Sequence, residues 1–133
     1  MATIRREVII HRSVDDVWAR VGDPADTPSW FPGMVSATVD GTSRVIVTGS
    51  GMRLPEEIVT IDQIARRFQY RVTLPFFEHH LGTIDVIAIG DGRTIVVYST
   101  ECKPDTLALV IGGAAGNALR ELRRQMESPD GVV

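Results

Sequence analysis

Residues 34 to 102 constrain the fold most, because apolar and polar residues alternate there with the period of a β-strand. Short turn signals, among them DGTS, GSG and GDGR, divide this region into six predicted strands. The predicted strands cover residues 34–40, 43–48, 53–62, 67–74, 80–90 and 93–102. Such connections are too short for the crossover that parallel strands need, so we expect consecutive antiparallel hairpins.

One further strand and two short helices are predicted before this region. Residues 3–11 have the alternation of a strand. Ser13, with Asp16 three residues later, has the spacing of a capping box, and apolar residues at helical spacing follow it. A second short helix is expected with Thr27 as its cap and Pro28 at its first position.

A long helix is predicted after the last strand, from Asp105 as cap to about Met126. It would be about 33 Å long, which is enough to cross the sheet. Its apolar stripe would comprise Leu107, Val110, Ile111, Ala114, Ala118, Leu119, Leu122 and Met126.

These elements predict an α+β fold in which a seven-stranded, strongly curved antiparallel sheet wraps around the C-terminal helix. A twisted sheet must cover one face, and this helix is the only element long enough to cover it. Gly112, Gly113 and Gly116 within the helix need a reason, since glycine costs about 1 kcal/mol against alanine there. Small residues facing the sheet either bring the helix close or leave empty volume.

Composition limits the classes of protein to consider. The chain has 133 residues, 44% of them hydrophobic, which suits one domain over residues 1–128 with a flexible tail at 129–133. A net charge of −3 does not favour nucleic-acid binding, and the lone Cys102 excludes an internal disulfide. No apolar stretch has the length of a signal peptide or a membrane span, so we expect a cytoplasmic protein without membrane insertion.

Two adjacent pairs of ionisable residues are candidates for chemistry. His79 and His80 lie at the start of a strand, where successive side chains point to opposite faces, so they cannot share one metal ion. His80 shares parity with Ile84 and should face inward, as a general acid or base or as a satisfied polar residue. Glu56 would be a carboxylate in an apolar hollow if it faces inward, whereas a surface position for both Glu56 and Glu57 stays open.

Aromatic residues form a third group of candidates. Tyr70 belongs to the apolar face of its strand, where it either donates a hydrogen bond to a ligand or packs with its hydroxyl satisfied. Four aromatic residues lie in or beside loops, as expected of a hydrophobic gate or of plugs at the ends of the core. These are Trp30, Phe31, Phe76 and Phe77.

The order of elements, with the segments VDDVWARVGDPADTPSWFPG, PEEIVTID, RRFQYRVTLP and RTIVVYSTECKP, resembles the START-like helix-grip (SRPBCC) superfamily. Within it the pattern is similar to the polyketide cyclase/dehydrase group, over roughly residues 3 to 127. The resemblance implies a deep apolar cavity between the sheet and the long helix. It also points to Glu56, six residues before Asp62, as a cavity-lining residue.

We therefore expect a protein that encloses a small hydrophobic molecule, with no cofactor and no metal, as a monomer or a homodimer. In an enzyme, Glu56, Tyr70 and His80 would supply proton transfer or stabilise an enolate during cyclisation or dehydration. The alternative is a carrier or sensor without turnover; a module whose pocket is filled by side chains is a third hypothesis. The ligand-binding residues would be Trp30, Phe31, Met34, Phe76, Phe77, Leu107, Ile111 and Ala114.

Overall fold

The structure, a computed structural model, describes residues 1–128, so the predicted tail at 129–133 lies outside the described residues. Its seven strands form one antiparallel sheet in the order β1-β7-β6-β5-β4-β3-β2. The strands are β1 (Ala2–Ile10), β2 (Met34–Asp40), β3 (Ser43–Thr48), β4 (Arg53–Asp62), β5 (Arg67–Val72), β6 (His79–Gly90) and β7 (Arg93–Lys103). The predicted run of six hairpin-connected strands is confirmed, and β1 pairs with β7 while β2 forms the other edge.

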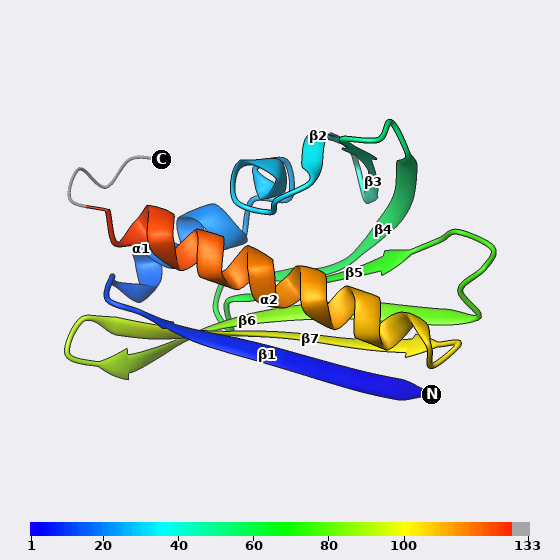
Figure 1. Ribbon diagram of the computed structural model, residues 1–133. Helices are drawn as coiled ribbons and strands as arrows, with labels where there is room; N and C mark the ends of the chain where they lie inside the picture. The colour runs from blue at the N-terminus through cyan, green and yellow to red at the C-terminus, as the bar shows by residue number, and fades with distance from the viewer. Residues whose placement is uncertain (129–133) are drawn as a thin grey trace.

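The long helix α2 (Leu107–Met126) lies across the concave face of the curved sheet, as Figure 1 shows. The predicted α+β helix-grip architecture is therefore confirmed. The helix begins at Leu107, and Thr106 occupies its N-cap without a side-chain hydrogen bond. Asp105, predicted as the cap, instead pairs with the N-terminal amine of Met1 at 3.1 Å. No helix within residues 1–128 combines the length and hydropathy needed to cross a membrane.

Gly112 allows α2 to pack closely against β1, which explains one of the glycines in this helix. A Cβ atom at this position would lie 2.6 Å from Cγ1 of Ile4 on β1, so only glycine lets the helix come this close. Gly113, on the exposed side of the helix, has no atom within 4 Å of the corresponding point. The close approach to the sheet thus involves one glycine of the adjacent pair and not the other.

Two short helical elements lie between β1 and β2 in the chain and also pack against the sheet. In α1 (Val14–Val21), the predicted cap is present, because the Asp16 amide donates to Oγ of Ser13 at 3.2 Å. The second element, η1 (Thr27–Ser29), is a single 3-10 turn that begins at Thr27, with Asp26 at its N-cap. The Thr27 hydroxyl therefore does not cap a helix; its oxygen accepts a hydrogen bond from the buried side chain of Arg44.

The hydrophobic core occupies one end of the space beneath α2, between the sheet, α1 and the C-terminal half of the helix. Its largest fully buried apolar side chains are Trp30, Phe68, Ile10, Ile84, Leu119, Leu122, Val17, Val21, Val86 and Val96. In the N-terminal half of α2, Gly112 packs against Ile4 of β1, and Ala108 and Ala115 are also buried. Val110, predicted to belong to the buried stripe, is 74% exposed, because it lies on the side of the helix opposite to Ala108 and Gly112.

Candidate functional site

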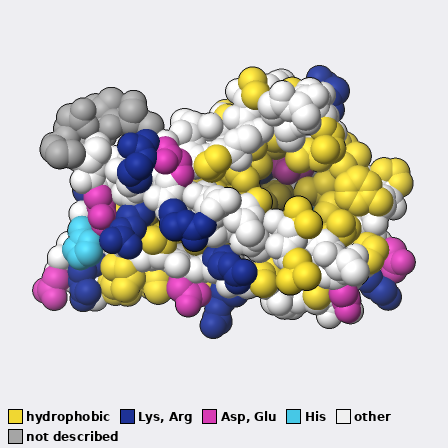
Figure 2. Space-filling view, viewed as in Figure 1, with side chains coloured by type: hydrophobic (Ala, Val, Ile, Leu, Met, Phe, Trp, Pro, Cys, Tyr) yellow, Lys and Arg dark blue, Asp and Glu magenta, His cyan; other side chains and the backbone are white. Residues whose placement is uncertain are grey.

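A cavity of about 440 Å³ lies under the N-terminal half of α2, between the helix and the concave face of the sheet. It is lined by Phe31, Pro32, Gly33, Met34, Thr48, Met52, Leu54, Glu56, Tyr70, Val72, Phe76, Phe77, His80, Tyr98, Leu107, Val110, Ile111, Ala114 and Ala115. Most of these side chains are apolar, and the volume falls in the range of sites that bind small molecules. Figure 2 shows its opening as a hollow surrounded by hydrophobic side chains.

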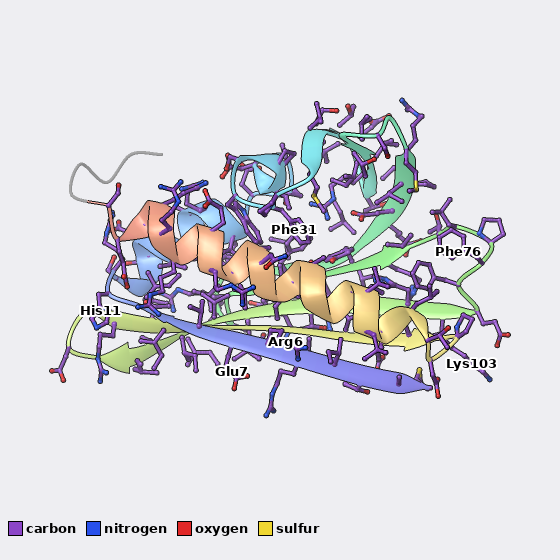
Figure 3. The ribbon with its side chains drawn as sticks, in the orientation of Figure 1. Arg6, Glu7, His11, Phe31, Phe76 and Lys103 are labelled. Atoms are coloured by element: carbon purple, nitrogen blue, oxygen red, sulfur yellow. The ribbon has the colours of Figure 1, made fainter. Side chains whose placement is uncertain are left out.

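Three largely exposed side chains, Met52, Phe76 and Val110, border the opening of the cavity. They come from the β3–β4 turn, the β5–β6 loop and α2, so the apolar rim joins three separate parts of the chain. Figure 3 shows Phe31 beside the middle of α2 and Phe76 beyond its N-terminal end. The cavity is thus open to solvent through an apolar entrance.

Glu56 lines the cavity and is buried, whereas its neighbour Glu57 is exposed. The alternation in β4 is ambiguous in the sequence because the pairing with β5 shifts between Ile58 and Thr60. This irregularity lets Ile58 and Ile61 both pack against the core, although they are three residues apart. Glu56 lies before the shift and therefore keeps the inward position that places a carboxylate in the hollow.

Arg44, on β3 opposite Glu56, is the main residue of the site that sequence reasoning missed. Its side chain is 1% exposed, and its Nη2 and Nε lie 2.6 and 2.7 Å from Oε1 of Glu56. Its Nη1 donates to Oγ1 of Thr27 and to the carbonyl oxygen of Pro24, both at 2.9 Å. Burial raises the pKa of Glu56, and the charge of Arg44 offsets part of that increase.

The sequence contains a signal for this pair. Arg44 has the same parity as Ile46, which is fully buried, and the short β3–β4 turn sets Arg44 directly across from Glu56. A carboxylate predicted to face an apolar hollow needs a partner, and the facing strand is where one would be found.

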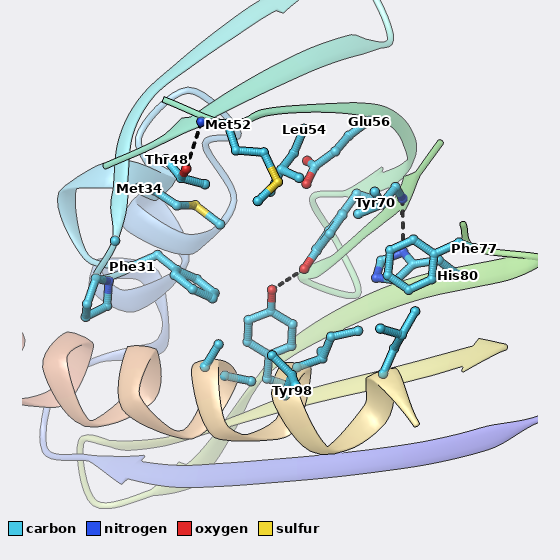
Figure 4. Close-up of a pocket in the computed structure, with 18 of the residues that line it drawn as sticks. Phe31, Met34, Thr48, Met52, Leu54, Glu56, Tyr70, Phe77, His80 and Tyr98 are labelled. Atoms are coloured by element: carbon cyan, nitrogen blue, oxygen red, sulfur yellow. Dashed lines mark hydrogen bonds between the residues drawn. The ribbon is translucent and has the colours of Figure 1, made fainter. Parts of the chain in front are cut away.

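Two tyrosine hydroxyl groups meet at the floor of the cavity. The hydroxyl groups of Tyr70 and Tyr98 share a hydrogen bond, drawn as a dashed line in Figure 4. Burial raises the pKa of Tyr98 to about 12 and that of Tyr70 well above its ordinary value, so both groups are neutral near pH 7. Gly82, opposite Tyr70 on β6, makes room for the ring, because a Cβ there would lie 2.7 Å from Cε1 and Cζ of Tyr70.

His80 lines the cavity with 3% of its surface exposed, whereas His79 is half-buried and contacts Glu101 at 3.2 Å. The Val72 amide donates to Nδ1 of His80 at 3.0 Å. The imidazole ring lies between Phe77 and Tyr70, with ring centroids 5.0 and 5.6 Å away. Burial, together with the nearby charges of His79 and Arg71, lowers the pKa of His80 to about 4.

Of the eight residues predicted to bind ligand, Trp30 alone is not among those that line the cavity. It is 1% exposed in the core cluster, with its ring centroid 6.0 Å from that of Phe31, so it supports the wall from behind. The seven that do line the cavity are Phe31, Met34, Phe76, Phe77, Leu107, Ile111 and Ala114. Besides Arg44, the prediction missed Thr48 on β3 and Tyr98 on β7, which both line the cavity.

Within residues 1–128 no three His, Cys, Asp or Glu side chains come together in a group able to hold a metal ion. The polar groups of the cavity are instead arranged as hydrogen-bonding partners: a carboxylate, two phenol hydroxyls and an imidazole. Such a set can accept, donate and transfer protons at a ligand held in a mostly apolar space.

The chain is similar in sequence to one described protein family and in fold to solved structures. A family model described as polyketide cyclase/dehydrase and lipid transport matches residues 1–128. No curated protein matches the sequence.

Three solved structures show the same fold. A Thermobifida fusca protein is 32% identical, with 96% of each chain covered and a TM-score of 0.77. XoxI from Bacillus cereus is 23% identical, with 93% of this chain and 94% of that one covered and a TM-score of 0.87. BexL, a di-domain ARO/CYC from the BE-7585A biosynthetic pathway, is 19% identical with a TM-score of 0.80; the match covers 96% of this chain and 47% of BexL.

Proposed function

Because the chain belongs to the family described as polyketide cyclase/dehydrase and lipid transport, we propose that it binds a small hydrophobic molecule under α2 and catalyses its cyclisation or dehydration. The observation that carries this proposal is the cavity of about 440 Å³, in which a few polar groups face an otherwise apolar space. The ligand would be polyketide-like, aromatic or lipid-like. The similarity to BexL, an ARO/CYC, supports chemistry on such a molecule.

Glu56 would act as the proton acceptor of this reaction. Its carboxylate takes a proton from a carbon next to a ligand carbonyl, and the electron pair moves onto the carbonyl oxygen. In a dehydration, the electron pair then returns from the oxygen to form a C=C bond as the C–O bond breaks, and Glu56 gives its proton to the departing hydroxyl group, which leaves as water. The raised pKa of Glu56 favours this exchange, because a more basic carboxylate is a better proton acceptor.

Tyr70 and Tyr98 would stabilise the oxygen on which negative charge develops. Their two hydroxyl groups hold two protons, and only one proton lies between them, so the other can point into the cavity. A fixed donor in a water-poor site stabilises an oxyanion more than a donor in water does. Gly82 and the neighbouring rings hold this donor in place before the ligand arrives.

A carrier without turnover is the second candidate function, and one observation favours it. The polar groups of the cavity are satisfied by the protein itself: Glu56 by Arg44, Tyr70 by Tyr98, and Nδ1 of His80 by a backbone amide. A network of this kind orients a ligand equally well without moving a proton.

Filling the cavity tests whether it binds the ligand at all. Ala114→Trp places a large side chain in the cavity, and Leu109→Trp, at an exposed position on the same helix, is its matched control. The proteins would be incubated with an organic extract of the source cells and analysed by native mass spectrometry. We expect a retained small molecule with the wild type and with Leu109→Trp but not with Ala114→Trp. Equal retention by both variants would place the ligand elsewhere.

Turnover separates the enzyme from the carrier. Glu56→Gln would be incubated with the same extract, so that a substrate is captured unconverted; the captured molecule would then be released, purified and incubated with the wild type or again with Glu56→Gln, and its mass and chromatographic mobility would be followed. An enzyme removes one water or changes the mobility at constant mass, and Glu56→Gln binds the molecule without changing it. If the wild type also returns the molecule unchanged, the protein is a carrier.

A further inference from the structure

The backbone determines which ring nitrogen of His80 carries a proton. The Val72 amide on β5 donates to Nδ1 at 3.0 Å, so Nδ1 must offer its lone pair. A neutral ring then carries its single proton on Nε2. An imidazolium would place an N–H group against the Val72 N–H, which the geometry opposes.

The position of the ring directs this Nε2–H group to the ligand. His80 lies on β6 with its side chain facing the cavity, and Figure 4 shows the ring nitrogen that is not bonded to Val72 pointing toward the interior. Phe77 and Tyr70 flank the ring, at centroid distances of 5.0 and 5.6 Å, and limit its rotation. The burial that favours the neutral ring also excludes most of the water that would compete for the proton.

We infer that His80, neutral near pH 7, is a hydrogen-bond donor that holds an acceptor oxygen of the ligand, such as a carbonyl, against the cavity wall. It positions the ligand and selects for such an oxygen, and it does not carry protons between reaction steps. The general acid or base role expected from the sequence does not fit this geometry, because Nδ1 is occupied. The inference rests on the proposed ligand-binding function and specifies one chemical feature of the ligand.

A pair of matched probes tests this role. 2-Acetylnaphthalene carries one carbonyl acceptor on a bicyclic apolar body, and 2-ethylnaphthalene has nearly the same shape without the oxygen. Calorimetry would give the affinity of both probes for the wild type, His80→Phe and the control His79→Gln. We expect His80→Phe to weaken the ketone by about 2- to 12-fold, as the loss of one net hydrogen bond implies, and to leave the hydrocarbon unchanged. His79→Gln should bind both probes as the wild type does.

The infrared band of the carbonyl, labelled with carbon-13, reports the hydrogen bond directly. In the wild type it should lie at lower frequency than in hexane, and in His80→Phe it should move back toward the hexane value. If His80→Phe does not fold, nitrogen-15 NMR of the wild type decides instead. The Nε2–H tautomer, with an Nε2–H signal that shifts on adding the ketone but not the hydrocarbon, is the expected result.

The outcomes separate the two proposals. If both probes bind equally, or if the band is the same in the wild type and His80→Phe, the donor role is wrong while the binding function stands. An imidazolium or an Nδ1–H tautomer in the NMR spectrum also overturns the donor role. If neither probe binds the wild type, the result contradicts the proposed cavity function together with the inference built on it.

Discussion

The guanidinium of Arg44 holds the carboxylate of Glu56 through two nitrogens, Nη2 at 2.6 Å and Nε at 2.7 Å, that contact the same oxygen, Oε1. Only 1% and 2% of the two side chains are exposed. The cation also lies 5.1 Å from the ring centroids of Phe68 and Tyr70. One buried charge thus supports a carboxylate and a phenol of the cavity, and through Thr27 it connects both to the segment that leads into the cavity wall.

Removing one partner of the Arg44–Glu56 ion pair should strongly lower the stability of the fold. Arg44→Met leaves the Glu56 charge buried without its partner, and we expect a loss of about 3–5 kcal/mol in the free energy of unfolding. In Arg44→Met/Glu56→Leu neither charge remains, so much of that stability should return. Urea unfolding of the single and double variants measures both effects.

A surface pair of similar geometry provides the control. Arg67 Nε and Asp85 Oδ1 are also 2.7 Å apart, but their side chains are partly exposed. Water competes for such a pair, so Arg67→Met should cost less than about 1 kcal/mol. Equal losses for Arg44→Met and Arg67→Met would show that burial does not determine the effect.

His80 should make the protein more stable as the pH rises from about 4 to 6.5. Its pKa is about 4 in the folded protein against an ordinary value of 6.5, so in this range the unfolded chain binds a proton that the folded protein excludes. The stability from His80 is therefore complete above pH 6.5 and is lost toward pH 4, by about 3 kcal/mol. Urea unfolding between pH 4 and 7 measures the slope.

Glu56 has the opposite effect on the pH dependence of stability over part of this pH range. The contribution of His80 is therefore obtained by comparing the wild type with variants of His80 and His79. A raised carboxyl pKa means that the folded protein keeps a proton above pH 4.5 that the unfolded chain releases, and stability falls as the pH rises. His80→Phe should remove the rise in stability with pH that comes from His80, whereas His79→Gln should keep most of it, because burial is the largest cause of the lowered pKa of His80. The same pH profile for His80→Phe and the wild type would contradict the assignment.

Gly82→Ala should displace the ring of Tyr70 and separate it from Tyr98. The added Cβ would lie 2.7 Å from two ring atoms of Tyr70, and such overpacking costs about 1–3 kcal/mol. Gly49→Ala is the control, since no atom lies within 4 Å of its Cβ position. We expect a lower urea midpoint and an altered near-ultraviolet tyrosine signal in Gly82→Ala alone. An unchanged tyrosine signal would mean that Gly82 does not position Tyr70.

The sequence predicted the elements well because strand periodicity and turn signals are local properties. The placement of His80 inside and His79 toward solvent follows from the same alternation, since β6 is regular as far as Ala88. Glu56 was harder to place, because the irregularity after Ile58 changes which later residues of β4 face inward. An extra residue in a strand cannot be located from the alternation of that strand alone.

The remaining errors come from contacts between distant segments. Arg44, at the start of a strand in which three consecutive apolar residues follow it, resembles a surface residue until Glu56 is placed across from it. Trp30 is expected from its loop position either at a gate, in contact with ligand, or as a plug at an end of the core; the structure places its ring in the core, after the turn η1. Val110 has the spacing of a core residue and borders the cavity opening instead, because the buried side of α2 at this level is the one that carries Ala108 and Gly112.

Adjacent glycines in α2 should respond in opposite ways to the same substitution. Gly113→Ala adds a methyl group where no atom lies within 4 Å, so it should raise the free energy of unfolding by up to about 1 kcal/mol through helix propensity. Gly112→Ala gains the same propensity, but its Cβ would lie 2.6 Å from Cγ1 and 3.1 Å from Cδ1 of Ile4. Overpacking of about 1–3 kcal/mol outweighs that gain, so the variant should be less stable than the wild type.

Adding Ile4→Ala to each glycine variant completes the test. The shortened side chain removes the two atoms nearest to the added Cβ and leaves Nη2 of Arg6, at 3.3 Å, so the Gly112→Ala substitution should cost much less in the Ile4→Ala background than in the wild type. The effect of Gly113→Ala should be nearly the same in both backgrounds, because distant sites contribute independently. Chemical unfolding of the six proteins measures these differences. If Gly112→Ala stabilises the wild type as much as Gly113→Ala does, then Gly112 is not what allows α2 to approach β1.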